Sequence, residues 1–347
     1  MTRSVLIIII IITLFSTSYA QKENFKPTLI GFYNLENFYD TVNNSAVDDE
    51  EFLPNSERHY NTHVFLDKVE RLGSVIAQIG TDINPDGFSL LGVAEIENDT
   101  VLNILIKNRN IKNRNIKIVH YNSPDKRGID VGLLYNPKYF TPIYSAPFFV
   151  KLPSGSKESF LTRDVLYVKG ILDGDTIHVM VNHWPSRSGG EERSIPARAA
   201  AAAVAKKIVD SLMAINKNTK VVIMGDLNDD PVSPSLTKIL GAKENMADVK
   251  DGGLFNPWVD FYKKGIGTIA YQDAWGLFDQ VVVSKGWLDK AQSGYHFYKA
   301  NIFNKEFLVQ QTGKYKGYPK RTWDGMTYNY GYSDHFPVYV TMLKKVN

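Results

Sequence analysis

Two polar residues follow the part of the chain with the clearest strand signal. Residues 221–224 form an unbroken apolar run, which predicts a strand covered on both faces, although a buried helical turn gives the same pattern. Gly225 would let the backbone pass close to another group, and Asp226 and Asn228 come next. Side chains two residues apart on an extended strand end point the same way. The pair could hold a water molecule against an electrophile; the alternative is a turn that only closes the strand.

Further polar residues lie within or next to the ends of predicted strands elsewhere. They are Asn34, Glu36, Glu95, His183, Asp279, Asp334 and His335. Carboxylates and amides dominate, and the chain has no cysteine, so Mg²⁺ or Mn²⁺ is the expected cation. Zinc is less suited, because the histidines do not stand in a spacing such as His-Glu-x-x-His. The acidic stretch 48–51 is expected to be a solvated loop, with a Ca²⁺ site as the alternative.

Hydrolysis of a phosphate ester is the reaction that these groups suit. A cation offsets charge on the phosphate oxygens while a carboxylate activates water for in-line attack. Asp279 is predicted on the same strand face as Leu277 and Val281, and a buried carboxylate needs a partner. His335 is a candidate partner, because a nearby carboxylate would keep its imidazole protonated and able to donate to phosphate.

Strands and helices must position these residues. Strands are predicted over 28–33, 88–93, 116–121, 128–135, 144–150, 160–172, 176–182, 277–283 and 336–340. Helices are predicted over 63–79, near 101–106, and over 197–215 after Pro196. The first has the apolar stripe Val69, Leu72, Ile76 and Ile79, and the last has Val204, Ile208, Leu212 and Ile215. The run of strands between 116 and 181 favours antiparallel sheets over alternating strand–helix units.

Two arginines lie near a glycine pair that precedes the long predicted helix. Arg187 stands in the loop before Gly189 and Gly190, and Arg198 is predicted in the first helical turn. A cation at the positive end of a helix dipole makes better sense if an anion docks nearby. Both are therefore substrate-binding candidates, with an exposed surface position as the alternative.

The first twenty residues have the pattern of an export signal. Arg3 precedes an apolar stretch over residues 5–15, and Ser18-Tyr19-Ala20 supplies small residues at the cleavage position. The stretch is shorter than the roughly 20 residues that span a bilayer, so a short anchor is only the alternative. We expect residues 1–20 to be cleaved and the protein to act in the periplasm or outside the cell, without a stable membrane anchor.

The remaining chain, residues 21–347, is expected to be one catalytic domain and a monomer. No linker rich in proline, serine or glycine divides it. The net charge of +3 for the full chain becomes +2 without Arg3, because residues 1–20 contain no acid. A near-neutral chain is not a binder held by bulk charge, so contact with a polyanion must be local.

The ordered motifs resemble the endonuclease/exonuclease/phosphatase superfamily. They are Tyr33-Asn34-Leu35-Glu36, Ala94-Glu95, His183, Gly225-Asp226-Leu227-Asn228, Phe278-Asp279-Gln280 and Ser333-Asp334-His335. Single motifs are weak, but six in order over nearly the whole chain are specific. The resemblance implies an α+β fold, a four-layer αββα sandwich of two mostly antiparallel sheets flanked by helices, with the site at one end of the sheets.

The resemblance also implies a role for each matched residue. Glu95 would be the main metal ligand, helped by Glu36 and Asp334. Asp226 would orient or deprotonate the attacking water, while Asn34 and Asn228 position phosphate or water. His335, held by Asp279, would bind a phosphoryl oxygen together with His183. Glu36 and His183 depart from the abasic-site repair enzymes, which have an aspartate and a tyrosine there, so repair of abasic sites is not expected.

Three functions follow as hypotheses. The first is an exported, metal-dependent phosphodiesterase that acts as a nuclease on DNA or RNA. The second keeps the site but takes another phosphoester, such as a sugar or inositol phosphate, a nucleotide or sphingomyelin. The third is a binding module that has lost catalysis, which the complete set of acids argues against.

Overall fold

Two six-stranded sheets form the centre of the computed structural model, which describes residues 24–153, 161–291 and 293–346. The predicted export signal lies outside these residues. The first sheet has the order β13 (Tyr295–Ile302), β16 (Val338–Val346), β1 (Asn24–Phe38), β2 (Leu90–Ile96), β4 (Asp130–Tyr135) and β3 (Lys117–His120). The second has the order β5 (Phe140–Phe148), β6 (Val165–Leu172), β7 (Asp175–His183), β8 (Lys220–Asp226), β12 (Asp279–Ser284) and β9 (Leu254–Phe255).

Most neighbouring strands run antiparallel, as predicted. The exceptions are β1 with β2 and β7 with β8, which are parallel pairs. The small sheets pair β10 (Ile269–Tyr271) with β11 (Ala274–Gly276), and β14 (Trp323–Asp324) with β15 (Thr327–Tyr328). Short 3₁₀ turns cover Glu50–Phe52, Lys112–Arg114, Met246–Asp248, Lys285–Trp287 and Glu306–Leu308, and a π turn covers Ser235–Ile239.

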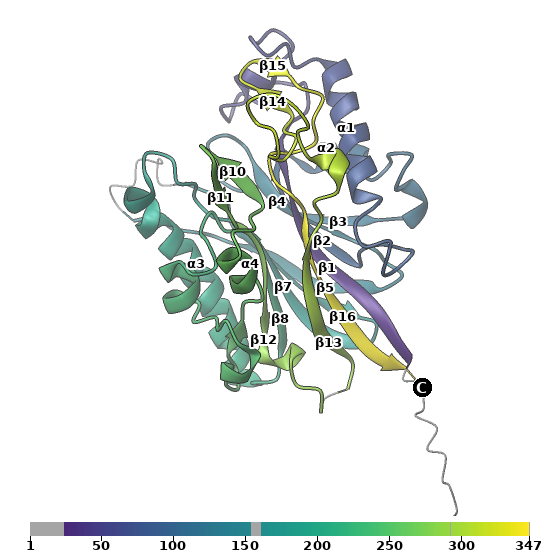
Figure 1. Cartoon of the computed structure of the whole chain (residues 1–347), viewed down its shortest axis with the longest axis vertical. Helices are drawn as coiled ribbons and strands as arrows, with labels where there is room; N and C mark the ends of the chain where they lie inside the picture. Colours follow the sequence, from purple (N-terminus) through teal and green to yellow (C-terminus); the bar gives the residue numbers. More distant parts are fainter. Residues whose placement is uncertain (1–23, 154–160, 292, 347) are drawn as a thin grey trace, which may run out of the picture.

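The four layers follow from which strand faces are apolar. Ile30 and Phe32 of β1 pack with Val222 and Met224 of β8 between the sheets. The outer face of the first sheet is covered by α1 (Thr62–Ile76) and α2 (Asp99–Leu105), and that of the second by α3 (Glu191–Ile215). A short helix, α4 (Val259–Lys263), lies beside the second sheet (Figure 1). The predicted αββα architecture is confirmed.

The first predicted helix is confirmed, with an earlier end. Asn61 caps α1 by accepting hydrogen bonds from the N–H groups of His63 and Val64. All four residues of the predicted stripe are buried, but the helix ends at Ile76 and Ile79 belongs to the following turn.

The start of α3 was predicted wrongly, and its packed face was predicted in part. The helix begins at Glu191, so Pro196 lies inside it instead of opening it. The main-chain bond that proline cannot donate is lost in an exposed stretch, where water can replace it. Ile208 of the predicted stripe is buried on the packed face, and Val204 and Leu212 pack there partly buried, whereas Ile215 is 86% exposed. The same face includes Ala197, Ala201 and Ala205. Small alanines let the helix lie close to the sheet.

The strand directions bring the chemistry to one end of the sandwich. The parallel pairs β1–β2 and β7–β8 end where the antiparallel strand β12 begins, and Asp279 pairs with Asp226 across β12 and β8. Gly225 makes this end possible, because a Cβ there would lie 2.1 Å from the carbonyl oxygen of Asn182 on β7. The predicted close approach at Gly225 is therefore present.

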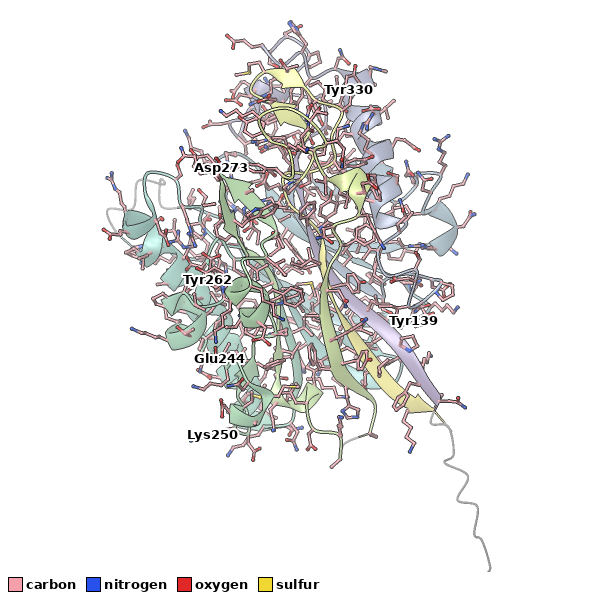
Figure 2. The ribbon with its side chains drawn as sticks, in the orientation of Figure 1. Tyr139, Glu244, Lys250, Tyr262, Asp273 and Tyr330 are labelled. Carbon is pink, nitrogen blue, oxygen red and sulfur yellow. The ribbon has the colours of Figure 1, made fainter. Side chains whose placement is uncertain are left out.

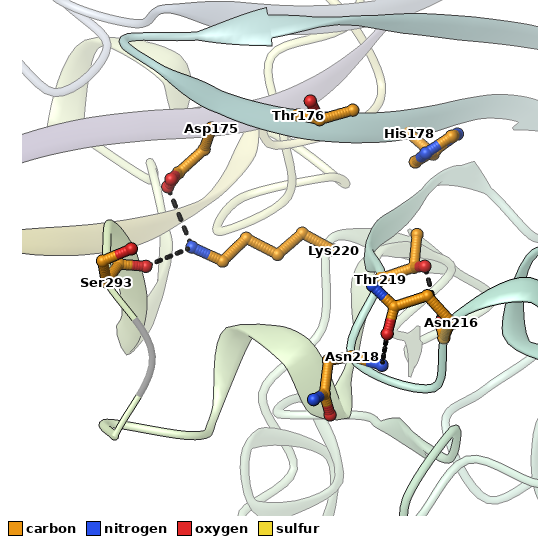
Figure 3. A pocket seen from close by; sticks show the side chains of 8 residues that line it. All are labelled: Asp175, Thr176, His178, Asn216, Asn218, Thr219, Lys220 and Ser293. Carbon is orange, nitrogen blue, oxygen red and sulfur yellow. Dashed lines mark hydrogen bonds and ion pairs between the residues drawn. The ribbon is translucent and has the colours of Figure 1, made fainter.

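A polar cavity of about 330 Å³ lies at the opposite end, where β7 and β8 begin (Figure 3). Lys220 donates to Asp175 at 2.8 Å and to the carbonyl of Ser293 at 3.4 Å. His178 lines the cavity, and its Nδ1 lies 2.6 Å from the hydroxyl of Tyr167. Burial, with Lys169 adding to it, lowers the pKa of His178 from 6.5 to about 4.

The lowered pKa of His178 leads us to expect that stability depends on pH. Because its folded-state pKa is depressed, the unfolded chain takes up this proton first as the pH falls. The contribution of neutral His178 to the unfolding free energy is therefore complete above pH 6.5 and is lost as the pH falls towards 4. The substitution His178→Gln is expected to reduce the loss of unfolding free energy between pH 7 and pH 4 by about 1–3 kcal/mol. Urea unfolding at a series of pH values measures this, with the exposed His63→Gln as control; equal slopes in both variants would contradict it.

Candidate active site

Strand ends from both sheets meet around the buried Asp226 and the half-buried Glu95. The Asn34 amide on β1 donates to Glu95 of β2 at 3.2 Å and to Asp226 of β8 at 3.1 Å. The N–H of Asn37 donates to the other oxygen of Glu95. The N–H of Asn228 donates to the other oxygen of Asp226. One amide thus joins the two sheets and holds the carboxylates together.

Three residues that the sequence predicted for the site have left-handed backbone. The φ angles are 48° at Glu36, 57° at Glu95 and 48° at Asn228. Positive φ is uncommon outside glycine and is often retained where function requires a side-chain direction. At Glu95 it falls where the ladder between β2 and β4 shifts register, so the carboxylate leaves the strand alternation.

His183 joins the acids from the end of β7. Its Nε2 lies 3.9 Å from Glu95 Oε1 and 3.7 Å from Asp226 Oδ2. Burial lowers its pKa well below the ordinary value, and Arg163 and Arg127 lower it further. A neutral ring with Nε2 towards two carboxylates has the character of a metal ligand.

His335 approaches Asp226 from the other side. Its Nδ1 lies 2.7 Å from Asp279 and its Nε2 lies 3.7 Å from Asp226, so the predicted Asp279–His335 contact is present. Burial alone would lower the pKa of His335, but Asp279 and Asp226 outweigh it and raise the pKa well above the ordinary value. The ring is therefore a cation that can donate from Nε2.

Asp226 lies between the two histidines. Burial raises its pKa to about 7; His335 opposes this rise, and Asp279 and Glu95 add to it. Glu95 differs: burial raises its pKa too, but Arg127, His335 and the Asn34 bond outweigh this and lower it. A carboxylate whose pKa is close to neutrality can accept a proton from water.

Asn228 follows Asp226, but its side chain bonds to a different partner. Its side-chain amide donates to the carbonyl of Trp184 at 2.9 Å, which connects the loops after β7 and β8. Trp184 itself is buried, in line with a packing role.

Glu36 and Asp334, the expected auxiliary metal ligands, lie beside the cluster. Glu36 accepts from the N–H of Thr322 at 2.6 Å, and Lys68 bonds its carbonyl oxygen. Arg321 lies 3.6 Å from Glu36 and 3.1 Å from Asp334. Among the described residues, the groups whose donor atoms converge within 4.8 Å contain neither acid. Arg321 pairs with both acids, and their role as auxiliary metal ligands stays a prediction.

The two arginines predicted to bind substrate, Arg187 and Arg198, lie in different environments. Arg187 is half-buried, with bonds to the carbonyl of Asn228 at 3.0 Å and to Asp230 at 3.0 Å, and it lines a cavity beside the site. Arg198 is fully buried in α3, with its Nε 2.6 Å from Asp229. The expectation that Arg198 binds substrate was wrong, because the earlier helix start places it a full turn deeper, where Asp229 neutralises it.

The comparison with protein-family models decides the family. A model described as "Endonuclease/Exonuclease/phosphatase family" matches residues 29–344. The chain belongs to this family. It is therefore a phosphoester hydrolase, as the ordered motifs predicted, and the comparison with curated proteins found no match.

Solved structures with the same fold share little sequence. An endonuclease/exonuclease/phosphatase family protein from Bacteroides thetaiotaomicron is 15% identical, with a TM-score of 0.54 over 93% of this chain and 97% of that one. A mannosyl-6-phosphatase from the same organism is 15% identical, with a TM-score of 0.53 over 91% and 99%. D. rerio TDP2 complexed with a single-strand DNA product is 12% identical, with a TM-score of 0.53 over 91% and 98%.

The donor set in this family member fits a divalent cation. Glu95, His183 and Asp226 offer ligand atoms within 4.8 Å of one another. Neutral amide and backbone N–H groups of Asn34, Asn37 and Asn228 donate hydrogen bonds to the two carboxylates. Two acids side by side, one of them buried, need positive charge, and oxygen donors favour Mg²⁺ or Mn²⁺.

Arg163 is a positioning residue that the sequence did not reveal. It is buried, donates to the carbonyls of His183 at 3.1 Å and Trp184 at 2.7 Å, and is paired with Asp125 at 2.8 Å. It thereby fixes the loop that carries His183. Its position inside the run 160–172, which was predicted to be all strand, carried no signal for this role.

Arg198 yields a stability prediction. Removing one partner of a buried pair leaves an uncompensated charge, so Arg198→Ala is expected to lower the unfolding free energy by about 3–5 kcal/mol. Urea unfolding measures the change, with the exposed Arg193→Ala on the same helix as control. An Arg198→Ala protein of unchanged stability but raised KM would restore the substrate role.

Proposed function

We propose that the chain is a divalent-metal-dependent phosphodiesterase that cleaves DNA or RNA. The observation that carries the proposal is Asp226, a buried carboxylate with raised pKa between neutral His183 and cationic His335. Hydrolysis requires a proton acceptor for water and a donor to the phosphoryl oxygens, and these neighbours supply both.

Each residue of the site has a role in the proposed hydrolysis. Glu95 and His183 would hold Mg²⁺ or Mn²⁺, which offsets charge on the phosphate when bound. Asp226 takes the proton of the attacking water. His335 donates from Nε2 to a phosphoryl oxygen, and Asp279 keeps that ring charged and oriented. Asn34 holds Asp226 and Glu95 at a fixed separation.

Nucleic acid is favoured by what surrounds these residues. Arg187 and Arg321 lie beside the site, and the cavities that they line contain Trp275, Tyr271 and Tyr318. Cations with aromatic rings are the usual means of binding single-stranded nucleic acid. The D. rerio TDP2 structure with its single-strand DNA product supports the same class.

A phosphatase acting on a sugar phosphate is the second candidate. The mannosyl-6-phosphatase of the same fold favours it. The near-neutral net charge of the chain also leaves room for a small substrate.

One assay panel separates the candidates. Residues 21–347 are incubated with plasmid DNA, RNA, a chromogenic phosphodiester, a sugar phosphate and sphingomyelin, each with Mg²⁺, Mn²⁺, Ca²⁺ or chelator. We expect metal-dependent cleavage of DNA or RNA. Turnover of the monoester alone would replace the nuclease proposal with the phosphatase.

We further propose export, on the basis of residues 1–20, and action as a monomer outside the cytoplasm. In the part of the chain that the structure describes, no helix is long and apolar enough to cross a membrane. Cell fractionation and analytical ultracentrifugation test these points; a cytoplasmic full-length product would refute export.

A further inference from the structure

A second feature of the site is a cavity of about 490 Å³ that opens next to Asp334 and Arg321. We call it the tyrosine cavity. It is lined by Ile269, Ala270, Tyr271, Gln272, Asp273, Lys314, Tyr315, Tyr318, Pro319, Arg321 and Asp334. One wall is the β10–β11 hairpin, whose tip carries Asp273 (Figure 2), and the other is the segment 314–321. Its volume lies in the range of small-ligand sites.

The aromatic rings in this cavity are held in place. The Tyr318 hydroxyl donates to the Asp273 carboxylate at 2.6 Å and accepts from the Asp273 N–H at 2.7 Å, which ties the two walls together. The rings of Tyr318 and Tyr315 are 5.8 Å apart, and Trp275 packs against Tyr318 at 6.0 Å. Fixed rings lose little conformational freedom when a flat ligand stacks on them.

Tyr271 is different, because its side chain contributes little to the fold. It is 72% exposed and lies on the wall that the tyrosine cavity shares with the neighbouring cavity containing Arg187. An exposed aromatic ring at the mouth of an active site offers a stacking surface, and every nucleobase has a flat face to match it.

Positively charged side chains line the cavity, and one of them, Arg321, is paired with Asp334 next to His335. The Arg321 side chain is 44% exposed and is oriented by Glu36 and Asp334. Lys314 lies over the Tyr315 ring at 5.3 Å. A guanidinium held by two carboxylates keeps its remaining N–H groups available to a phosphate oxygen.

We propose that the tyrosine cavity is a nucleotide subsite, in which the base stacks on Tyr271 and the phosphate lies against Arg321. The proposal rests on the proposed function, because it gives the phosphoester that reaches Asp226 and His335 a nucleoside on one side. A sugar phosphate or lipid headgroup lacks the ring that would use the cavity.

The test compares two ligands that differ only in the base. Calorimetry measures the Kd of adenosine 5′-monophosphate and of ribose 5-phosphate for residues 21–347 with Mg²⁺, using the Asp226→Asn protein to prevent turnover. Base stacking is worth about 1–3 kcal/mol, so the nucleotide is expected to bind about 5- to 150-fold more tightly. Tyr271→Ala should abolish this preference, and Tyr271→Phe should retain it. Tyr298→Ala, at an exposed tyrosine on β13, is the matched control and should also retain it.

The outcomes distinguish the subsite from the activity. Equal affinities for the two ligands, or a preference that survives Tyr271→Ala, would overturn the subsite even if the protein cleaves DNA. A preference that depends on Tyr271, in a protein that cleaves no polynucleotide, would keep the subsite and shift the substrate to mononucleotides.

Discussion

Replacing Asp226 with asparagine is expected to lower kcat by about 10³-fold with little change in KM or stability. The amide has the shape of the carboxylate but cannot take a proton from water, and general-base catalysis is typically worth about 10² to 10⁴ in rate. The buried acid loses its charge without leaving a cavity, so the fold should tolerate the change. Steady-state kinetics on the best substrate of the panel, with a thermal melt, measures both effects.

Asp210→Asn is the control for that substitution. Asp210 is an exposed acid on α3, paired with Lys206 away from the site, and its loss should leave kcat unchanged. An Asp226→Asn protein that retains more than about a tenth of wild-type kcat would remove Asp226 from the chemistry.

Removing the metal is expected to have an equally large effect. Chelation should abolish turnover, and Mg²⁺ or Mn²⁺ should restore it. At 100 times its Kd, a cation that binds only the folded state adds about 2.7 kcal/mol to the unfolding free energy, which a thermal melt detects without an activity assay. Glu95→Gln is expected to abolish that stabilisation, because it removes the charged ligand.

The metal-free Glu95→Gln protein gives a second prediction. Burial raises the pKa of Glu95, but Arg127, His335 and the Asn34 bond outweigh it and lower the pKa. The charge of Glu95 therefore stabilises the fold even without metal, and Glu95→Gln is expected to lower the unfolding free energy of the metal-free protein. A metal-free variant at least as stable as wild type would contradict this expectation. Glu244→Gln, an exposed acid paired with Lys263, is the matched control (Figure 2).

Much of the site was accessible from residue type and order along the chain. Asn34, Glu95, His183, Asp226, Asp279 and His335 could be named because each polar residue interrupts or ends an apolar strand pattern. Strands that bury both faces carry a strong signal, and a polar residue within one needs a reason. The same patterns predicted two sheets with outer helices.

Where local pattern and tertiary environment disagreed, the environment decided. Arg198 has the same local signature as a surface arginine, and only the packing of α3 against Asp229 shows it to be buried. Pro196 signals a helix start, yet the helix continues through it because its missing bond falls in an exposed stretch. Arg163 and Arg321 act through partners at least 13 residues away in sequence, a distance that periodicity does not address.

Residue type and strand periodicity alone determined the chemistry available to this chain: hard oxygen donors, two histidines and no thiol, at the ends of apolar strands. The tertiary structure decided the charge states. His183 and His335 are the same residue type after or before a strand, but one faces Arg163 and Arg127 and the other Asp279 and Asp226. Their pKa values move in opposite directions because electrostatic energy depends on distance in space and on burial.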